Sequence, residues 1–569
     1  MTKQLDRRTF LKGMGISAAA VAATGALAAC SSGSDAPAEN AAAEPAEALN
    51  AADQKWAFEI APEPIAEDAI AETIEADVIV VGCGMSGMVT AASCAENGLS
   101  VKIVTASTIP VSRGGSNNGV YSKVMEELGL PRMDPTWFYR MQYAANGGNI
   151  LPSLWYKFYN NSEEAINWII DIAANAGIKT TIESGPVYKP GDPMYTPPAA
   201  HAFYVDDAEL NGAVGTGEGY IANELARYLA EDLGVEIFWS TKGEQLIRED
   251  NNTGRVTAVV ASTADGTYKK YVGTKAVVLA CGDFSHDKDM MTRYCPQALE
   301  MCDFSGEVNY DQGIWMGGLM PGEGHKMGLW VGAAWQKSPN VIMLGRPNLP
   351  ADQPYTNHTG LLVDCNGQRF MNEDTLGGLA CTTFMHLPKN TAYCIWGTNR
   401  AADGGPWGKI NGIQGEYFTT EEVIERWDND TDGFGIIKAD TVEEIISQLG
   451  LPAETIDTVN RYNEMCAAGV DTDFYKVPEK LIGINDGPFY GASFTPGFLT
   501  SLGGLRTDVH LRVCDADDQP IPGLFNVGAM IGDFYSGTYT FAMEGMNYGA
   551  CCITLPYCLG KELASGELD

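Results

Sequence analysis

The chain has 569 residues, of which 45% are hydrophobic, and its formal net charge at pH 7 is −36. This length predicts more than one domain, and the hydrophobic content is enough for a large core. The negative charge excludes nucleic acids and anionic membrane surfaces as binding partners. It is typical of a solubilising surface or, alternatively, of a surface that docks a basic protein.

The N-terminus has the pattern of an export signal. Residues 6–12 (DRRTFLK) resemble a twin-arginine motif, the Ala-rich apolar run 14–29 is too short for a settled transmembrane helix, and residues 27–30 (LAAC) resemble a bacterial lipobox. We therefore expect a signal peptide over residues 1–29 and a lipid on Cys30, which would be the sole membrane attachment of an extracytoplasmic protein. Because the twin-arginine route carries proteins that fold before export, commonly around a cofactor, a cofactor site is expected further along the chain.

The composition changes sharply after the signal. Residues 30–74 are rich in Ala, Glu and Pro and predict a flexible acidic linker. Residues 77–81 (DVIVV) then predict a buried parallel strand, a helix of small residues continues to Asn97, and residues 101–104 predict a second strand. This strand–helix–strand unit predicts an α/β fold with a Rossmann-like dinucleotide-binding domain.

A GxGxxG motif follows the first of these strands directly. Its glycines are Gly82, Gly84 and Gly87, which serve a tight turn, the approach of a pyrophosphate to the backbone, and close helix–strand packing. Met85 and Ser86 open the helix, whose N-terminus offers unpaired N–H groups and the positive end of a dipole to phosphates. In this context the motif predicts dinucleotide binding.

The second strand departs from the usual pattern. It ends in Thr105-Ala106, where a Glu or Asp usually holds the adenosine ribose. A threonine hydroxyl still forms a hydrogen bond to a ribose, but without the charge-assisted strength of a carboxylate. Because FAD and NAD share the GxGxxG motif, other segments must distinguish between them.

The rest of the chain alternates helices and strands. We expect helices over 125–185, and a mixture of helix, strand and loop over 335–500. The last seventy residues return to strand, Gly-rich turn and helix. The expected segments between these regions are a helix near 220, a strand at 235–239, hairpin-like strands at 256–260 and 268–272, and a buried strand at 276–280.

Six further segments carry a family resemblance. Three of them are 112–119 (SRGGSNNG), 277–284 (VVLACGDF) and 521–529 (IPGLFNVGA), and the other three are 322–328 (GEGHKMG), 367–373 (GQRFMNE) and 503–508 (GGLRTD). In this order they resemble the FAD-binding segments of the fumarate reductase/succinate dehydrogenase flavoprotein superfamily. The resemblance is to its soluble branch, which includes flavocytochrome-type fumarate reductases, urocanate reductases and 3-ketosteroid dehydrogenases, and it covers residues 75–569.

The resemblance implies a Rossmann-like FAD-binding domain interrupted by an α+β capping domain. The FAD-binding domain would comprise residues 75–334 and 501–569, and the capping domain residues 335–500, with the active site between them. The residues implied to bind FAD are Gly82, Gly84, Met85, Ser86, Gly87, Thr105, Ala106, Arg113, Gly114, Gly115, Ser116, Asn118, Gly119, Gly243, Ala280, Cys281, Gly282, Glu323, Gly528, Ala529, Thr540 and Phe541. Because Arg113–Gly119 contains no His, the expected FAD is non-covalent.

Four positions depart from fumarate reductase. Gly377 stands where that family has its proton-donating Arg, and Ser338, Thr500 and Ser536 stand where it has two His residues and a carboxylate-binding Arg. Arg–carboxylate pairs are bidentate and strong, and Gly, Ser or Thr cannot replace them. We therefore expect a substrate other than fumarate.

Three residues are candidates for the chemistry. Tyr535 aligns with a tyrosine that polarises the enone carbonyl in 3-ketosteroid Δ1-dehydrogenases, and Tyr539 stands where that group has a Gly. A neutral phenol can donate a hydrogen bond to an enone or cinnamoyl-type acceptor. The alternative is that both rings only pack the flavin rim. His358 is a candidate proton donor, and its alternative is an ordinary surface histidine.

These observations leave three functional hypotheses. The first is an FAD-dependent ene-reductase that saturates an activated C=C of a small organic acceptor, in anaerobic respiration, by hydride transfer from flavin N5. The second is a 3-ketosteroid dehydrogenase-like enzyme that forms a C=C, and the third is a non-catalytic flavin- or ligand-binding lipoprotein. The chain has no CxxCH haem motif, so electrons are expected from a separate c-type cytochrome or quinol-linked carrier. No metal site is predicted, although an iron–sulfur cluster built from distant cysteines among the 14 stays an open alternative.

Overall fold

The computed structural model describes residues 55–183, 195, 197–205, 217–314, 316–345, 360–408, 413–431 and 433–568. The predicted signal peptide, Cys30 and His358 lie outside the described residues. Among the helices that these residues form, none combines the length and the apolar character needed to cross a membrane.

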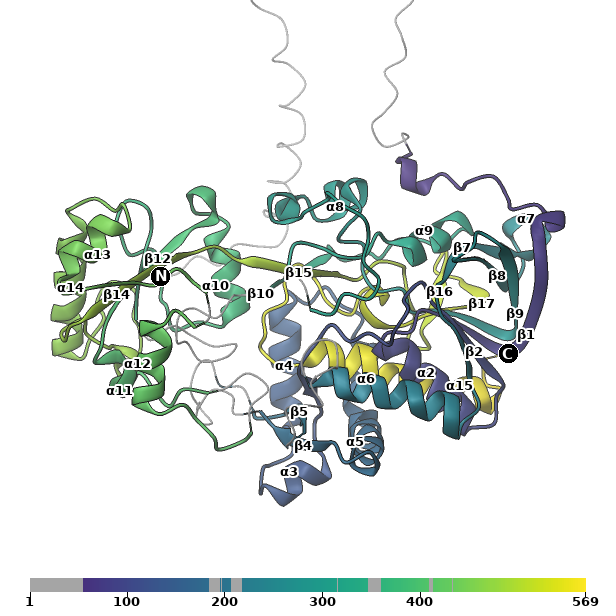
Figure 1. Cartoon of the computed structure of the whole chain (residues 1–569), viewed down its shortest axis with the longest axis horizontal. Helices are drawn as coiled ribbons and strands as arrows, with labels where there is room; N and C mark the ends of the chain where they lie inside the picture. The colour runs from purple at the N-terminus through teal and green to yellow at the C-terminus, as the bar shows by residue number, and fades with distance from the viewer. Residues whose placement is uncertain are drawn as a thin grey trace, which may run out of the picture. The chain divides into compact units, whose positions relative to one another are not determined.

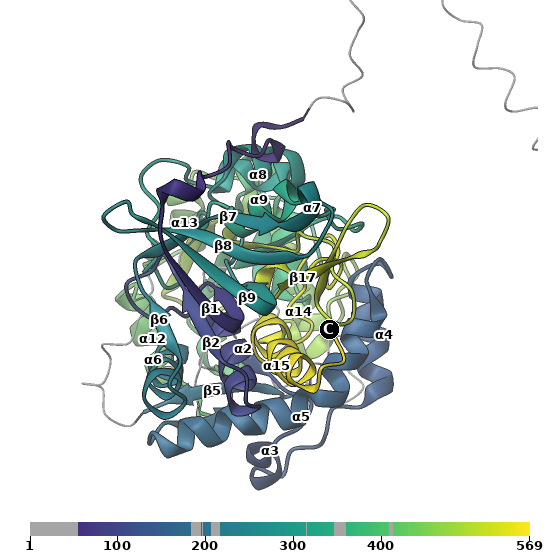
Figure 2. The ribbon, with the colours of Figure 1, turned by 90° about the vertical axis from the view of Figure 1, so that its right-hand side faces the viewer.

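The first large element is a mostly parallel sheet at the heart of the dinucleotide-binding domain (Figures 1 and 2). Its path is β16-β17-β9-β1-β2-β6, and β7 and β8 extend it as an antiparallel hairpin beside β9. The strands are β1 (Ile70–Val81), β2 (Val101–Val104), β6 (Glu236–Phe238), β7 (Thr241–Arg248), β8 (Val256–Thr263), β9 (Tyr268–Leu279), β16 (Arg512–Cys514) and β17 (Pro520–Asn526). The strands predicted at 77–81, 101–104, 235–239, 256–260, 268–272 and 276–280 are therefore confirmed.

Both faces of this sheet are covered, which explains the unbroken apolar run in β1. Val78 and Val80 pack on one side with α2 (Met85–Glu96), α5 (Pro152–Asn175) and α15 (Leu555–Ser565). Ile79 and Val81 pack on the other side with β8 and α9 (Glu323–Trp330), as Figure 2 shows. A strand buried on both faces needs apolar side chains at successive positions rather than alternating ones.

A three-stranded sheet lies among the helices that follow β2. It has the order β3 (Asn117–Asn118), β5 (Ala200–Tyr204) and β4 (Lys179–Ile182), and its neighbours are α3 (Lys123–Glu127), α4 (Pro135–Ala145), α5 and α6 (Glu218–Arg227). The expectation of helix over 125–185 is confirmed up to Asn175 and is wrong for β4. Three β-branched residues in succession, 180–182, favour the strand, and β5 supplies its backbone partners.

The inserted region has its own sheet and its own core. Its strand order is β11 (Leu361–Val363), β12 (Ala392–Gly397), β14 (Phe489–Phe494) and β13 (Ile437–Ala439). Helices α10 (Gly377–Phe384), α11 (Arg400–Asp403), α12 (Thr420–Asp428), α13 (Val442–Gln448) and α14 (Thr455–Ala468) accompany it. An antiparallel pair, β10 (Val341–Gly345) and β15 (Gly497–Leu502), brackets the insertion. The α/β class with an inserted α+β region is confirmed.

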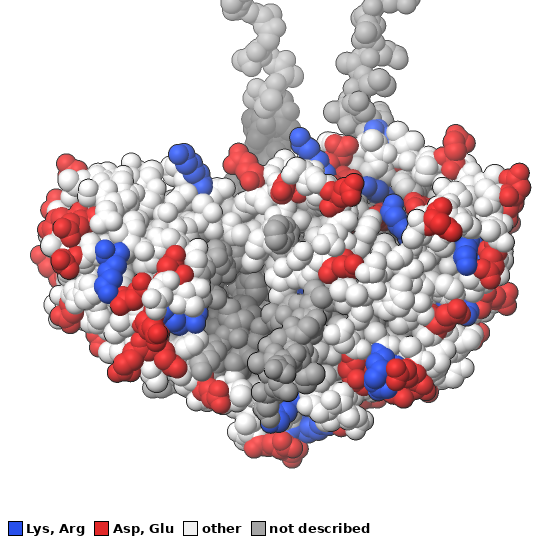
Figure 3. Space-filling model, viewed as in Figure 1, with Lys and Arg blue, Asp and Glu red and all other residues white. Residues whose placement is uncertain are grey.

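Acidic side chains account for the surface charge. Figure 3 shows Asp and Glu on every part of the face that it presents, interspersed with Lys and Arg. They do not gather in one patch on this face, and dispersed charge of one sign keeps a protein soluble. The distribution favours the solubilising interpretation for the face shown.

The prediction of a flexible linker over 30–74 is wrong for residues 55–74. Phe58 is 5% exposed and packs in a cluster with Phe284 and Met291. The Phe58 carbonyl accepts a hydrogen bond of 2.9 Å from the Trp330 indole, and Glu59 pairs with Arg293 at 2.6 Å. Phe58 thus anchors the start of this Ala- and Glu-rich segment, and Ile70–Ile74 pair with β9 at its end.

We predict that Phe58→Ala lowers the free energy of unfolding by about 3–5 kcal/mol, because it leaves a cavity in this cluster. Ile60→Ala is the matched control, since Ile60 is 59% exposed, and its effect should stay within about 0.5 kcal/mol. Urea titrations of the flavin-loaded protein measure both. Equal losses from the two variants would show that residues 55–74 do not belong to the folded body.

Candidate active site

A cavity of about 390 Å³ opens at the carboxyl ends of β1, β2 and β9. Ligand pockets of this kind are typically a few hundred Å³ and occur at this edge of parallel sheets. The residues predicted to bind FAD that line it are Gly82, Gly84, Met85, Ser86, Thr105, Ala106, Arg113, Gly114, Gly115, Ser116, Gly243, Ala280, Cys281, Gly282, Glu323, Ala529 and Phe541. Segments that lie as far as 450 residues apart in the chain therefore form one wall, as the resemblance implied.

The GxGxxG turn has the geometry that a pyrophosphate requires. Gly82 has a φ of +113°, and a Cβ on it would lie 2.3 Å from the Ala280 carbonyl oxygen. A Cβ on Gly87 would lie 2.1 Å from the Gly82 carbonyl oxygen, so α2 sits directly against the strand ends. At Gly84 the space is open, with the nearest atom 4.0 Å away. The residues present thus fit a dinucleotide whose phosphates approach Gly84 and the N-terminus of α2.

The adenosine end of the motif uses hydroxyl groups. The Thr105 N–H donates to the Phe238 carbonyl at 3.0 Å, and its hydroxyl lies 2.8 Å from the Ser107 hydroxyl. Lys242 also lines this cavity, which the sequence did not indicate, and it pairs with Glu323 at 3.5 Å. A hydroxyl pair thus occupies the position of the expected carboxylate.

Five residues predicted to bind FAD lie behind the cavity wall rather than on it. Gly87 contacts Gly82, and Gly119 lies against Ile166 and His201. The side-chain amide of Asn118 donates to the Glu544 carbonyl at 2.9 Å. Gly528 has a φ of +77° and lies beside Ser86, and Thr540 lines a separate small pocket. These five positions shape the wall rather than line it, and their predicted binding to FAD stays a prediction.

The inserted region closes the other side of the cavity. Met343 and Leu344 from β10, Leu499 and Thr500 from β15, and Gly377 at the start of α10 all line it. No sequence motif in β10 or β15 indicated that Met343, Leu344 or Leu499 would line the cavity. At the next position of α10, a Cβ on Gly378 would lie 2.2 Å from the Tyr539 carbonyl oxygen, and Thr382 meets Thr538 at 2.9 Å between their hydroxyls.

The structure distinguishes the two candidate tyrosines. Tyr539 lines the cavity, and its hydroxyl oxygen accepts the Asn547 N–H at 3.2 Å. Tyr535 does not line it: its ring lies behind Tyr539 at 5.3 Å between centroids, against Trp155 and Phe534. The Tyr535 hydroxyl is buried near Tyr539 but makes no hydrogen bond of normal geometry to any described residue. Of the two candidate tyrosines, Tyr539 is therefore the one that faces the cavity, and the role of either phenol in the chemistry stays a prediction.

Burial keeps both phenols protonated. It is the main cause that raises the pKa of both Tyr539 and Tyr535 above the ordinary value of 10.0. Because a phenolate in an apolar wall is poorly solvated, the neutral form persists well above physiological pH. At the cavity wall, Tyr539 is thus a hydrogen-bond donor rather than a base.

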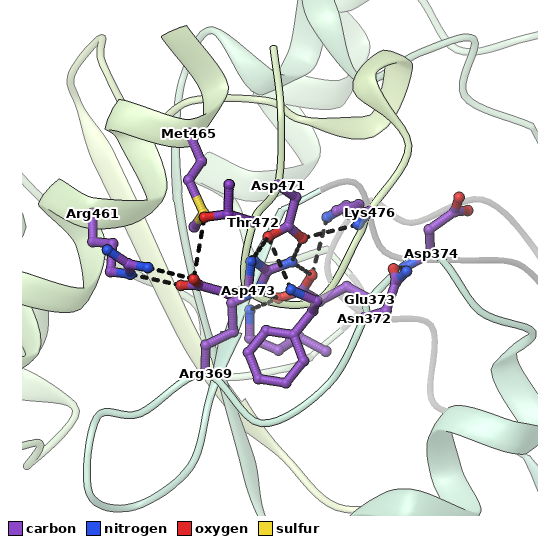
Figure 4. A network of polar contacts seen from close by, with 12 residues as sticks. Arg369, Asn372, Glu373, Asp374, Arg461, Met465, Asp471, Thr472, Asp473 and Lys476 are labelled. Atoms are coloured by element: carbon purple, nitrogen blue, oxygen red, sulfur yellow. Dashed lines mark hydrogen bonds and ion pairs between the residues drawn. The ribbon is translucent and has the colours of Figure 1, made fainter. Parts of the chain in front are cut away.

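The GQRFMNE motif forms a buried network of charges in the inserted region (Figure 4). Arg369 donates at 2.7 Å to both Glu373 and Asp471, and the Lys476 ammonium lies 3.4 Å from Glu373. None of these side chains is more than 5% exposed. Burial alone would raise the pKa of Glu373, but Lys476 and then Arg369 outweigh it and hold that pKa below its ordinary value. The network fixes the start of the segment that reaches the cavity at Gly377.

Together, these features define a dinucleotide-binding fold whose cavity is lined by the ends of the main sheet and by the inserted region. Residues 77–544 match the family described as FAD binding domain, and the chain belongs to this family. It is an FAD-dependent oxidoreductase of that family, and the resemblance drawn from its motifs is confirmed.

Two relatives and one solved structure illustrate the likeness. The chain is 23% identical to vinyl phenol reductase of Lactiplantibacillus plantarum, over 85% of this chain and 94% of that protein. It is 25% identical to digoxin reductase of Eggerthella lenta, over 94% of this chain and 93% of that protein. The fold resembles the 3-ketosteroid-Δ4-(5α)-dehydrogenase of Rhodococcus jostii, with a TM-score of 0.67, 22% identity, and coverage of 88% of this chain and 99% of that one.

We predict that Glu373→Gln lowers the free energy of unfolding by about 3–5 kcal/mol, because it leaves two buried cations with too little compensation. Glu231→Gln is the control, since it removes one partner of the exposed pair with Arg227 and should cost less than about 1 kcal/mol.

The stability of the protein should also depend on pH through Glu373. Because the pKa of Glu373 is lowered in the folded state, its contribution to the free energy of unfolding is complete above the ordinary value of 4.5 and is lost as the pH falls below that value. Urea titrations at pH 7 and pH 4 test both statements; variants of equal stability at pH 7 would contradict them.

Proposed function

We propose that the protein is an extracytoplasmic ene-reductase that reduces an activated C=C in a neutral, conjugated organic acceptor and does not act on fumarate. The observation that carries this proposal is the wall that the inserted region presents to the cavity. Apart from Thr500 and Gly377, its described lining residues are Met343, Leu344 and Leu499, with Tyr539 and Phe541 beside them. An apolar and aromatic wall favours a neutral acceptor over a dicarboxylate, whose binding needs paired cations.

The positions where fumarate reductases carry cations support the same conclusion. Gly377 and Thr500 line the cavity with neutral groups. Ser338 and Ser536 are both buried. The Ser338 hydroxyl donates to the Tyr535 carbonyl at 3.1 Å, and the backbone N–H of Ser536 donates to the Asn146 side chain at 2.9 Å. A dicarboxylate would therefore find no guanidinium at any of these four positions.

The chemistry follows from the protonated phenol. FAD, once bound and reduced by the electron carrier, would supply a hydride to the acceptor carbon and return to its oxidised form, and one proton from water would complete the saturation of the C=C. Since the Asn547 N–H donates to the Tyr539 oxygen, the hydroxyl proton of Tyr539 is available to the acceptor's oxygen atom. A donor placed where negative charge develops stabilises the transition state more than the ground state.

The FAD is proposed to be non-covalent. Among the described residues, no histidine lines the cavity, and the loop Arg113–Gly119 contains none. Electrons are proposed to arrive from a separate c-type cytochrome or quinol-linked carrier. Among the described residues, no group of three or more His, Cys, Asp and Glu side chains is placed to hold a metal ion.

A dehydrogenase that forms a C=C in a steroid-like ketone is the second candidate, because the same apolar cavity suits a ring system. The direction of the reaction distinguishes the two candidates. Anaerobic reoxidation of reduced flavin by 4-vinylphenol or a conjugated enone supports the ene-reductase. Flavin reduction by a saturated ketone, together with turnover only in the presence of an artificial oxidant, supports the dehydrogenase. A flavin that neither class of compound reacts with would mean a non-catalytic protein.

We predict that Tyr539→Phe slows reoxidation of the reduced flavin by these acceptors about 10²- to 10³-fold, because one donor to the developing negative charge is lost. Tyr535→Phe is the control, since its hydroxyl lies behind the wall, and it should change the rate less than about threefold. Stopped-flow flavin absorbance gives both rates, and acid precipitation should release the FAD into solution from both variants. Rapid reoxidation by fumarate, or a larger effect from Tyr535→Phe, would contradict this site.

A separate prediction concerns export. We propose that the lipid on Cys30 is the membrane attachment, so Cys30→Ala should move the protein from the membrane fraction to a soluble one. Replacing Arg7 and Arg8 by Lys should leave the precursor inside the cell, because the twin-arginine route requires both. Ser31→Ala is the control and should change neither the export of the protein nor its attachment to the membrane. Fractionation and mass spectrometry of the mature N-terminus measure these outcomes.

A further inference from the structure

Arg113 is the one cation that the second Gly-rich loop contributes to the cavity. Of the described residues that line the cavity, Arg113 and Lys242 are the basic ones and Glu323 is the acidic one. Lys242 is already paired with Glu244 and Glu323, each at 3.5 Å. The Arg113 side chain is 17% exposed, and its Nε is buried without a hydrogen-bond partner among the described residues. Its donors are therefore less committed than those of Lys242.

Asp283 is the counter-charge of Arg113. This carboxylate lies in the turn after β9 and is fully buried, and the Ser285 hydroxyl and the Ser285 and Met320 N–H groups donate to it at 2.9–3.3 Å. The Arg113 Nη1 lies 3.7 Å from Asp283 Oδ2. That separation is too long for a hydrogen bond, so the pair attracts through charge while the guanidinium N–H groups stay available.

Thr500 ties this pair to the inserted region. The Thr500 hydroxyl donates to Asp283 Oδ2. Thr500 belongs to β15, where it pairs with Met343 of β10. On the other edge of β10, Ile342 forms a bridge to Thr538, the neighbour of Tyr539. Segments that carry Thr500 and Tyr539 therefore flank the same strand, and both residues line the cavity. Arg113 lines the cavity as well, and Asp283 lies behind the wall in contact with both Arg113 and Thr500.

From this arrangement we infer that Arg113, beside Asp283 and Thr500, is a second hydrogen-bond donor to the acceptor's conjugated oxygen. The pair of Arg113 and Asp283 then selects a neutral acceptor over an anionic one. This inference rests on the proposed function. Because Asp283 balances the guanidinium charge, the site carries a strong donor without net positive charge. Such a site binds a neutral phenol or carbonyl oxygen and disfavours a carboxylate, whose own charge would remain uncompensated against Asp283.

The binding of a neutral and an anionic para-substituted ethylbenzene tests this preference without turnover. The probes are 4-ethylphenol, which is neutral at pH 7, and 4-ethylbenzoate, which is anionic, and their binding to the oxidised FAD-loaded protein is read from the flavin absorbance. We expect the wild type to prefer 4-ethylphenol. Arg113→Gln should weaken its binding about 10- to 100-fold, because a charge-assisted hydrogen bond is lost. Asp283→Asn should have the opposite effect on charge selection and shift the preference toward 4-ethylbenzoate by at least about 10-fold.

Further variants keep the test independent of folding. The double variant Arg113→Gln/Asp283→Asn restores the charge balance, so it should fold and load FAD while still binding 4-ethylphenol weakly. Arg227→Gln, on the surface of α6, is the matched control and should bind both probes like the wild type. Thermal melting and flavin content are recorded for every variant.

The outcomes separate this inference from the proposed function. If the wild type reduces 4-vinylphenol and Arg113→Gln retains its KM, kcat and 4-ethylphenol affinity, the inference is overturned and the function stands. If no acceptor is reduced but Arg113→Gln still weakens the binding of 4-ethylphenol, the proposed function is overturned and the inference stands. If both the single and the double variant lose FAD itself, Arg113 holds the cofactor rather than the acceptor, and the inference is overturned.

Discussion

The close contact of α2 with the ends of β1 and β9 is the constraint on which the site depends. Gly82 and Gly87 leave no room for a Cβ against Ala280 and against each other, so the first turn of the helix is held directly above the strand ends. The N-terminal N–H groups of that helix then face the cavity, where phosphates of a dinucleotide are favoured. Any side chain at these glycines would displace the helix and with it the wall that later segments complete.

A second constraint is the two-stranded connection between the domains. β10 and β15 carry residues of the inserted region to the cavity, and the hydrogen bond from Thr500 to Asp283 fixes β15 to the turn after β9. The buried network around Arg369 fixes the chain that precedes Gly377. The position of the cavity's far wall thus depends on charged groups that never face it, because a buried charge tolerates few alternative arrangements of its partners.

The sequence predicted the parts of the fold that have a local pattern. The apolar run at 77–81 and the GxGxxG turn specify strand, turn and helix within about twenty residues, and the structure follows them closely. Residues 55–74 were mispredicted, because the packing of Phe58 and the pairing of Ile70–Ile74 with β9 outweigh a composition typical of linkers. Likewise, the resemblance to 3-ketosteroid dehydrogenases pointed to Tyr535 as the residue beside the acceptor. Only the packing of the C-terminal segment shows that Tyr539 stands in front of it.

The start of α10 packs directly against the C-terminal segment. Helix α10 begins at Gly377, and a Cβ on Gly378 would lie 2.2 Å from the Tyr539 carbonyl oxygen, so even a methyl group there would require one of the two segments to move. This contact involves the backbone of residue 539 and would exist whatever its side chain. Gly377, Thr500 and Tyr539 all line the cavity, so a large side chain at position 377 would enter space that the cavity now leaves open for a ligand. The small residues at the start of α10 thus set both the packing of the C-terminal segment and the room beside it.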